Sequence, residues 1–233
     1  MEKWLYLSLI IFTVLVPFVR SFEPRIAFYK KWKAFFPAVA IIGLAFILWD
    51  IKFTEMGVWG FNPTYLSGLY ISNLPIEECL FFLVIPYSSM FVYEVFEYFF
   101  KKDLPERINK TLAIALGLIN LAVAFQFSDQ AYTFYSQLIN GLVLILIALA
   151  RPKILKGFWR MFAVILIGFF IVNGILTGSF IEGEVVWYSS AEIIGVRLGT
   201  IPVEDVFYGM SLILLNLFLY KVFKRRLRID WIR

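Results

Sequence analysis

Seven long apolar runs, separated by short joints rich in charged residues, glycine or proline, dominate the sequence. The hydrocarbon core of a bilayer is about 30 Å thick, and a helix needs about 20 residues to cross it. Each run is close to that length, and open strands in lipid would leave backbone groups unpaired. The sequence therefore predicts an all-α integral membrane protein with seven transmembrane helices. The runs extend over residues 4–19, 34–51, 76–100, 112–127, 134–150, 161–176 and 203–222.

Lysine and arginine are concentrated in alternate joints and in the carboxyl-terminal tail. Of the 22 basic residues, all but Lys3, Lys52 and Arg197 lie there. Under the positive-inside rule this pattern predicts an outside amino terminus and a cytoplasmic carboxyl terminus in a multi-pass protein of the cell membrane. The basic tail, which runs from Lys221 to Arg233, is expected to lie against anionic lipid headgroups, and nucleic acid is not an expected partner.

Two similar acidic motifs, LPIEECLFF at residues 74–82 and IPVEDVFYG at residues 201–209, indicate an internal repeat. The repeat unit moves along the chain by four helices, an even number, so both copies are predicted to point the same way. This gives a parallel 3+1+3 layout resembling that of rhodopsins, with a first repeat at 1–106, a linking helix at 107–129 and a second repeat at 130–233. A shift of 127 residues places Pro75 on Pro202, Glu77 on Glu204, Glu78 on Asp205 and Phe81 on Tyr208.

The carboxylates of these motifs have two interpretations. A proline at a helix start followed by an acid in the first turn is typical of capping, because the helix dipole stabilises negative charge there. Alternatively, the aromatic and aliphatic neighbours of Glu77 and Glu204 remove water from these acids, which favours their neutral, proton-donating form. The adjacent acids Glu78 and Asp205 add to this effect, since neighbouring carboxylates resist joint ionisation.

Composition excludes several kinds of chemistry. The chain has one cysteine and no histidine, which argues against internal disulfides, zinc sites and catalysis by Cys/His or Ser/His/Asp arrangements. It also has no Gly-x-Gly-x-x-Gly segment, which argues against a Rossmann-type flavin or nicotinamide domain. The sequence therefore predicts no cofactor and no metal, and leaves the chemistry to carboxylates and aromatic side chains.

The two acidic motifs, together with LWDIKF and GVWGFN upstream of the first and VRLGT before the second, resemble the membrane-embedded lycopene cyclase family. This is the non-flavin kind, found as heterodimers or as fused tandem chains. The resemblance implies a lycopene β-cyclase, an intramolecular lyase or isomerase that converts the acyclic ψ-ends of lycopene into β-rings, giving γ- or β-carotene. Its implied partners are a lipid-soluble carotenoid and membrane lipids, and no net oxidation occurs.

The resemblance also implies catalytic roles for Glu77, Glu78, Glu204 and Asp205. Neighbouring residues of a helix point about 100° apart, so only one acid of each pair can point squarely into the bundle. We expect Glu77 and Glu204 to be the inward pair, one donating a proton and the other accepting it.

Four further residues are expected to bind substrate: Asp50, Phe81, Asn173 and Tyr208. Asn173 stands where the repeat would otherwise offer an acid like Asp50, which leaves open whether the two halves are catalytically equivalent. The aromatic residues of the loops before the two motifs are interpreted as anchors in the membrane interface rather than as binding residues. They are Trp59, Trp187 and Tyr188.

Two other classes share features with this sequence. A rhodopsin-like protein has the same number of spans, but the last run has no lysine at its middle for a retinal Schiff base, since Lys221 lies at its end. A proton-coupled transporter uses intramembrane acids as relays, whereas the acids here cluster toward one membrane face. The sequence leaves open the oligomeric state and whether one or both ends of the carotenoid are cyclised.

Overall fold

The computed structural model describes residues 2–229, which fold mainly into helices. Arg233, the last basic residue of the predicted tail, lies outside the described residues. Within them, seven helices are long and apolar enough to cross a membrane, as the sequence predicts. These helices are α1 (Leu5–Arg20), α2 (Trp32–Glu55), α3 (Ile76–Phe99), α4 (Glu106–Gln126), α5 (Ala131–Ala150), α6 (Phe158–Leu176) and α7 (Val203–Arg226).

Proline fixes the starts of the two motif helices. Pro75 and Pro202 occupy the N-cap positions of α3 and α7 in an extended conformation, so both helices begin at the predicted residue. Helix α4 instead begins at Glu106, six residues before the predicted start. The charged first turns of α4 follow Pro105 and are helical, although their composition favoured a loop. Short 3-10 helices lie at Glu2–Trp4, Phe28–Lys31, Pro63–Tyr65 and Pro152–Leu155.

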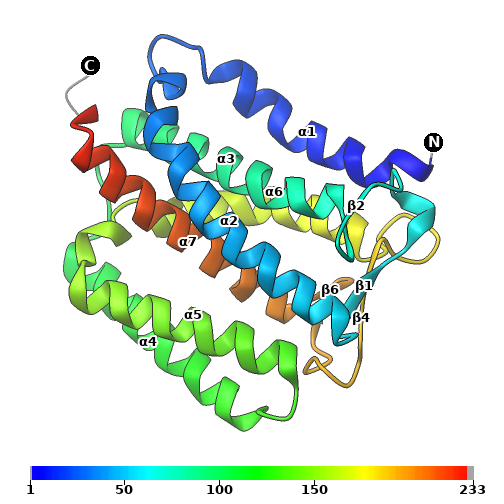
Figure 1. Ribbon diagram of the computed structural model, residues 1–233. Coiled ribbons are helices and arrows are strands. Elements are labelled where there is room, and N and C mark those ends of the chain that lie inside the picture. Colours follow the sequence, from blue (N-terminus) through cyan, green and yellow to red (C-terminus); the bar gives the residue numbers. More distant parts are fainter. Residues whose placement is uncertain (1, 230–233) are drawn as a thin grey trace.

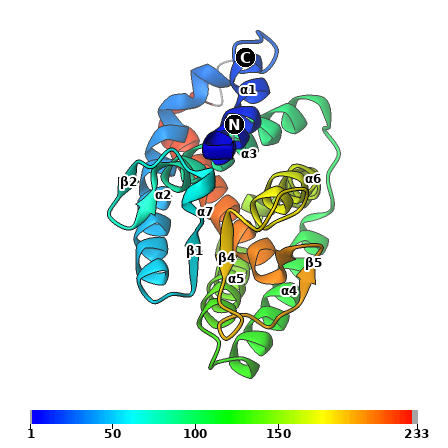
Figure 2. The same cartoon turned by 90° about the vertical axis from the view of Figure 1, so that its right-hand side faces the viewer.

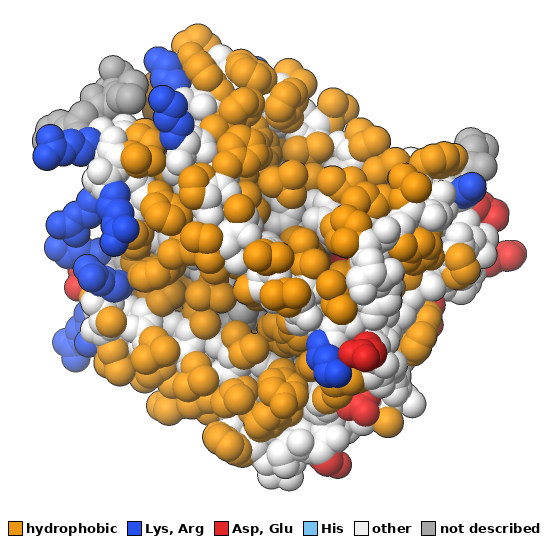
Figure 3. All heavy atoms as spheres, viewed as in Figure 1, with side chains coloured by type: hydrophobic (Ala, Val, Ile, Leu, Met, Phe, Trp, Pro, Cys, Tyr) orange, Lys and Arg blue, Asp and Glu red, His pale blue; other side chains and the backbone are white. Residues whose placement is uncertain are grey.

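The helices alternate in direction through the bundle. In Figure 1, helices α1, α3, α5 and α7 all start at the right-hand end, which also carries the strands. We call this the strand end. Figure 3 shows hydrophobic side chains over most of the visible face, with lysine and arginine gathered at the opposite end. This distribution agrees with the basic joints of the sequence. The orientation in a membrane, the 3+1+3 grouping and the rhodopsin-like layout stay predictions.

Between residues 2 and 229, six short strands, which the all-α prediction did not include, form three antiparallel pairs at the strand end. Two of the pairs are hairpins directly before α3 and α7, and they recur at the 127-residue shift seen in the sequence. The third pair, β1–β4, joins segments that lie more than 120 residues apart in the chain, and Figure 2 shows these two strands side by side. The pairs are β2 (Tyr70–Ile71) with β3 (Leu74–Pro75), β5 (Arg197–Leu198) with β6 (Ile201–Pro202), and β1 (Trp59–Phe61) with β4 (Val186–Tyr188).

The β1–β4 pair has one face toward the bundle interior and one face outward. Gly60 is paired with Trp187, and a Cβ added at Gly60 would lie 2.3 Å from the Trp187 ring. The indole of Trp187 therefore covers the outside of the pair. Successive side chains of a strand point to opposite faces. Trp59, next to Gly60, and Val186, next to Trp187, therefore point inward and are buried.

Two glycines and a proline take part in two close helix contacts. Gly117 of α4 and Gly141 of α5 face one another, and a Cβ added at Gly141 would lie 2.8 Å from the Gly117 carbonyl oxygen. In α1, Pro17 cannot donate to the carbonyl of Thr13, the residue four positions earlier. The hydroxyl of Ser88 in α3 donates to that carbonyl at 3.1 Å, which ties α1 to α3.

Candidate active site

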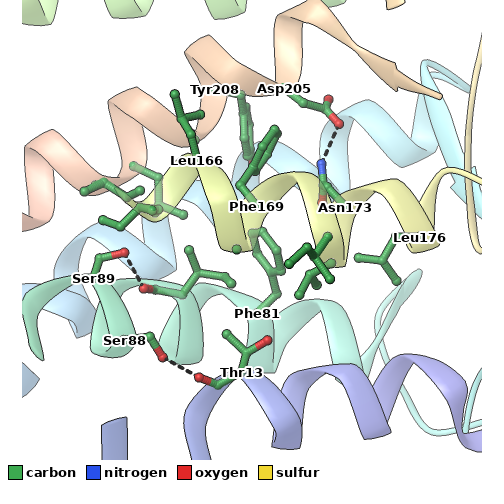
Figure 4. Close-up of a pocket in the computed structure, with 18 of the residues that line it drawn as sticks. Thr13, Phe81, Ser88, Ser89, Leu166, Phe169, Asn173, Leu176, Asp205 and Tyr208 are labelled. Atoms are coloured by element: carbon green, nitrogen blue, oxygen red, sulfur yellow. Dashed lines mark hydrogen bonds between the residues drawn. The ribbon is translucent and has the colours of Figure 1, made fainter. Parts of the chain in front are cut away.

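A cavity of about 420 Å³ lies inside the bundle and extends from the strand end past the middle of the helices. Figure 4 shows it between α1 and α3 on one side and α6 and α7 on the other. Most of its lining is apolar or aromatic, but three carboxyl groups also line it: Asp50 from α2, Glu78 from α3 and Asp205 from α7. None of the described residues that line the cavity is a lysine or an arginine.

Asp205 accepts hydrogen bonds from three side chains. The Tyr132 hydroxyl donates to Oδ1 at 2.5 Å, and the Tyr188 hydroxyl donates to Oδ2 at 2.9 Å. The Asn173 amide Nδ2 also donates to Oδ2, at 2.8 Å (Figure 4). Hydrogen bonds donated to a carboxylate stabilise its negative charge. Of the three carboxyl groups in the cavity, Asp205 is therefore the best suited to be ionised.

Glu78 and Asp50 each accept a hydrogen bond from one tyrosine. The Tyr6 hydroxyl donates to Glu78 Oε2 at 2.6 Å, and the Tyr208 hydroxyl donates to Asp50 Oδ1 at 2.9 Å. The two carboxyl groups interact electrostatically with one another and with Asp205. Like charges placed this close resist joint ionisation. The arrangement therefore favours a proton shared among the three carboxyl groups.

The two halves of the site share a geometry but differ in chemistry. In each half, a tyrosine two helices earlier in the chain donates to the acid: Tyr6 of α1 to Glu78 of α3, and Tyr132 of α5 to Asp205 of α7. The groups beside these pairs are unequal, because one half offers the carboxyl group of Asp50 and the other the amide of Asn173. The site is therefore a near-symmetric frame that carries an extra acid on one side only.

Glu77 and Glu204 are fully buried but do not line the cavity. Oε1 of Glu77 accepts from the Ser67 amide at 2.7 Å, and Oε1 of Glu204 accepts from the Ile194 amide at 2.8 Å. The Thr133 hydroxyl also donates to Glu204, at 2.6 Å. These two acids point back onto the loops that precede their helices, and their Oε2 atoms have no hydrogen-bond partner in the part of the chain that the structure describes.

The structure therefore differs from the expectation that Glu77 and Glu204 are the inward pair. Both are buried, as expected, but Glu78 and Asp205 are the acids that face the cavity. The reason is geometric: the first acid of each motif caps the backbone of the preceding loop, and the next residue is turned about 100° toward the interior.

The four residues expected to bind substrate all line the cavity: Asp50, Phe81, Asn173 and Tyr208. Tyr208 lies at the centre of an aromatic group, with its ring centroid 5.0 Å from that of Trp49 and 5.1 Å from that of Phe46. Phe81 and Phe169 also project into the cavity in Figure 4. The faces of such rings attract positive charge.

Two residues interpreted as membrane-interface anchors belong to the cavity instead. Trp59 and Tyr188 line it from β1 and β4, whereas Trp187 is 40% exposed. Tyr188 lies outside the membrane-spanning helices, where burial and the nearby Asp205 raise the pKa of its phenol well above the usual value. Tyr188 therefore keeps its proton and remains a hydrogen-bond donor to Asp205.

Sequence reasoning missed three tyrosines of the site: Tyr6, Tyr132 and Tyr188. The sequence did carry a signal for Tyr6 and Tyr132, because a tyrosine occurs at a similar place in the first helix of each repeat. That spacing is 126 residues rather than 127, so an ungapped superposition of the two motifs does not align them.

A protein-family model described as lycopene cyclase matches residues 3–96 and 129–223, so the chain carries the pattern twice. Each matched segment contains one of the two acidic motifs and one of the cavity acids Glu78 and Asp205. Comparisons with curated proteins and with solved structures give no match. Because the two matched segments together cover most of the chain, the protein belongs to the lycopene cyclase family.

Proposed function

We propose that the protein is a lycopene β-cyclase, an isomerase that converts acyclic carotenoid ψ-ends into β-rings without net oxidation. Family membership implies carotenoid cyclisation in general. The observation that supports the finer proposal is an aromatic, apolar cavity that holds three carboxyl groups and no cation among its described lining residues. Such a site can both deliver and remove a proton away from water.

The reaction needs one proton donor and one proton acceptor. A proton adds to the terminal double bond of the ψ-end and leaves a tertiary cation. An internal double bond attacks that cation, which closes the ring and moves the positive charge onto a ring carbon. Loss of a proton from the neighbouring carbon forms the ring double bond. One proton enters and one leaves, so no redox partner is required.

Hydrogen bonding supports different roles for the cavity acids. Glu78 and Asp50 each have one tyrosine donor and lie close to another carboxyl group, so this pair retains a proton most readily. Asp205 has three donors and is best suited to be the ionised base. We assign proton donation to Glu78, supported by Asp50, and proton removal to Asp205.

Aromatic side chains account for the stability of the cations. Phe81, Phe169 and Tyr208 line the cavity between the acids of α3 and α7. Their ring faces stabilise positive charge without a nucleophilic atom that would trap it. The Tyr208 hydroxyl also donates a hydrogen bond to Asp50. One side chain therefore contacts an acid of the proton-donating pair and offers a ring face to the cation.

Glu77 and Glu204 are assigned as positioning residues. Each holds the backbone of the loop before its helix, and Glu204 also holds Thr133 of α5. These contacts fix the start of the helix whose next residue faces the cavity. Replacing Glu77 or Glu204 therefore acts on the reaction through the placement of Glu78 or Asp205.

We also propose how the chain is arranged and oriented in the membrane. The paired hairpins and the two matched family segments support a parallel tandem repeat with α4 as the link. The basic side chains at the end opposite the strands support a cytoplasmic carboxyl terminus. The acids then lie toward the outer face of the cell membrane.

The test is expression in a lycopene-accumulating bacterium, followed by pigment analysis. The native chain is expected to convert lycopene into pigments with β-rings, and Glu78→Gln and Asp205→Asn are expected to leave the acyclic pigment. Glu106→Gln, an exposed residue at the start of α4, is the matched control for expression and should cyclise normally. If the native chain is present in the membrane but leaves lycopene unchanged, the proposal is contradicted. That is the result expected of a proton-coupled transporter.

A further inference from the structure

The cavity has a side opening between α1 and α6. Six residues both line the cavity and are exposed on the outer surface of the bundle. On α1 they follow helical spacing, and on α6 they do the same, so each helix contributes one edge of the opening. We call these residues the mouth: Phe12, Leu15 and Val16 of α1, and Val164, Gly168 and Ile171 of α6.

The mouth lies at the middle of the bundle rather than at either end. Its residues fall well inside α1 (Leu5–Arg20) and α6 (Phe158–Leu176), which are both long enough to span a membrane. All six are apolar, and Phe12 is 70% exposed. A mid-depth opening with such edges faces hydrocarbon, where exposed apolar side chains carry no penalty.

Polar groups near the mouth are bonded within the protein. The Thr13 hydroxyl donates to the Leu9 carbonyl at 2.8 Å, and the Ser88 hydroxyl donates to the Thr13 carbonyl, as Figure 4 shows. The Ser89 hydroxyl donates to the Ile85 carbonyl at 2.7 Å. The path from the mouth to the acids is thus apolar, and it suits a hydrocarbon rather than water or an ion.

The arrangement of the acids limits how many ends can react at once. Asp50, Glu78 and Asp205 interact electrostatically with one another and so form one cluster inside the cavity. One cluster serves one cyclising end at a time. A carotenoid carries its two ends at opposite tips of a long conjugated chain, so the second end lies away from the acids while the first reacts.

We propose that the mouth admits a single ψ-end of a carotenoid from the bilayer while the rest of the polyene stays in lipid, so that each binding event closes one ring. This inference rests on the proposed cyclase function. It adds the route by which the substrate enters and the number of rings closed per binding event. A second ring on the same molecule requires release, reversal in the bilayer and re-entry. The monocyclic carotenoid is therefore a free intermediate that mixes with the membrane pool.

Gly168 provides the test of the route. A Cβ added at Gly168 meets no atom within 4 Å, and alanine is favoured over glycine inside a helix. The series Gly168→Ala, Gly168→Leu and Gly168→Phe therefore fills the mouth stepwise from a position where a Cβ fits. The matched control is Ile167→Phe, at an exposed neighbouring residue of α6 that does not line the cavity.

The measurement is kcat/KM for lycopene, with purified protein in lipid vesicles. The Ile167→Phe control should stay within about twofold of the native value. The kcat/KM should fall stepwise through the Gly168 series, by at least tenfold in Gly168→Phe. Equal kcat/KM for Gly168→Phe and the control would overturn the route. Absence of any ring product from the native protein would instead refute the cyclase function itself, so the two failures are distinguishable.

A trapping experiment tests how many rings are closed in each binding event. Native protein is given lycopene in vesicles that already contain an excess of isotopically labelled monocyclic carotenoid. If each binding event closes one ring, the first bicyclic product carries the label in the same high proportion as the monocyclic pool, and a protein that stops at one ring releases only unlabelled monocyclic product. Unlabelled bicyclic product in the first turnovers would show that both ends react in one binding event and would overturn the proposal.

Discussion

Replacing Asp205 with asparagine separates its proposed chemical role from its structural role. The amide has nearly the shape of the carboxyl group, and its oxygen can still accept from Tyr132. Its NH₂ group takes the place of Oδ2, which accepts from both Tyr188 and Asn173. The Tyr188 hydroxyl can turn to accept instead, which leaves one unpaired buried donor at a cost of about 1–3 kcal/mol.

The effect on the rate should be larger than the effect on stability. A positioned general base contributes about 10²–10⁴-fold, which corresponds to about 3–5 kcal/mol of barrier. Asp205→Asn should therefore lower kcat for lycopene by at least about 100-fold while the protein remains folded.

The assay pairs single-turnover pigment analysis in vesicles with thermal unfolding in detergent. Asn173→Ala is the comparison variant, because it removes one donor and keeps the carboxylate. It should lower kcat by only about tenfold. If Asp205→Asn retains a rate within threefold of the native protein, Asp205 is not the base, and the argument from its three donors is wrong.

Three more outcomes follow from other contacts. Tyr188→Phe removes one donor to Asp205 and should lower kcat about tenfold. In the native protein, kcat should show no loss from ionisation of the Tyr188 phenol between about pH 6 and 9, because its raised pKa keeps the phenol protonated there. Gly117→Leu should separate α4 from α5 and lower the unfolding temperature, at a cost of about 1–3 kcal/mol, with an unchanged product. Glu94→Gln should cost about 3 kcal/mol, since Glu94 is 4% exposed and pairs with Lys31 and Lys224; an unchanged unfolding temperature would contradict this.

Helix boundaries are best predicted from the sequence where the covalent geometry of a single residue sets them. The starts of α3 and α7 follow from Pro75 and Pro202, whose fixed φ and missing amide hydrogen suit a helix boundary. The start of α4 could not be found from hydropathy, because its first turns extend beyond the apolar run. The β1–β4 pair could not be predicted either, since it depends on a contact between distant loops.

The site shows a similar division. The repeat identifies all four motif acids and the cavity residues Asp50 and Asn173. It does not say which acid of each pair faces inward, because that depends on the loop amide that the first acid caps. Tyr188 had an ambiguous signal, since aromatic residues near a span end serve both as interface anchors and as site residues.

The β1–β4 pair has a consequence for product identity. Trp59, Phe61, Val186 and Tyr188 of these strands line the cavity, and Trp187 covers the pair from outside. A tertiary carbocation that meets water forms an alcohol and releases a proton. Under the proposed mechanism this two-stranded roof keeps water away from the cation, and a variant that loosens it, such as Gly60→Val, should give some product hydrated at the same double bond.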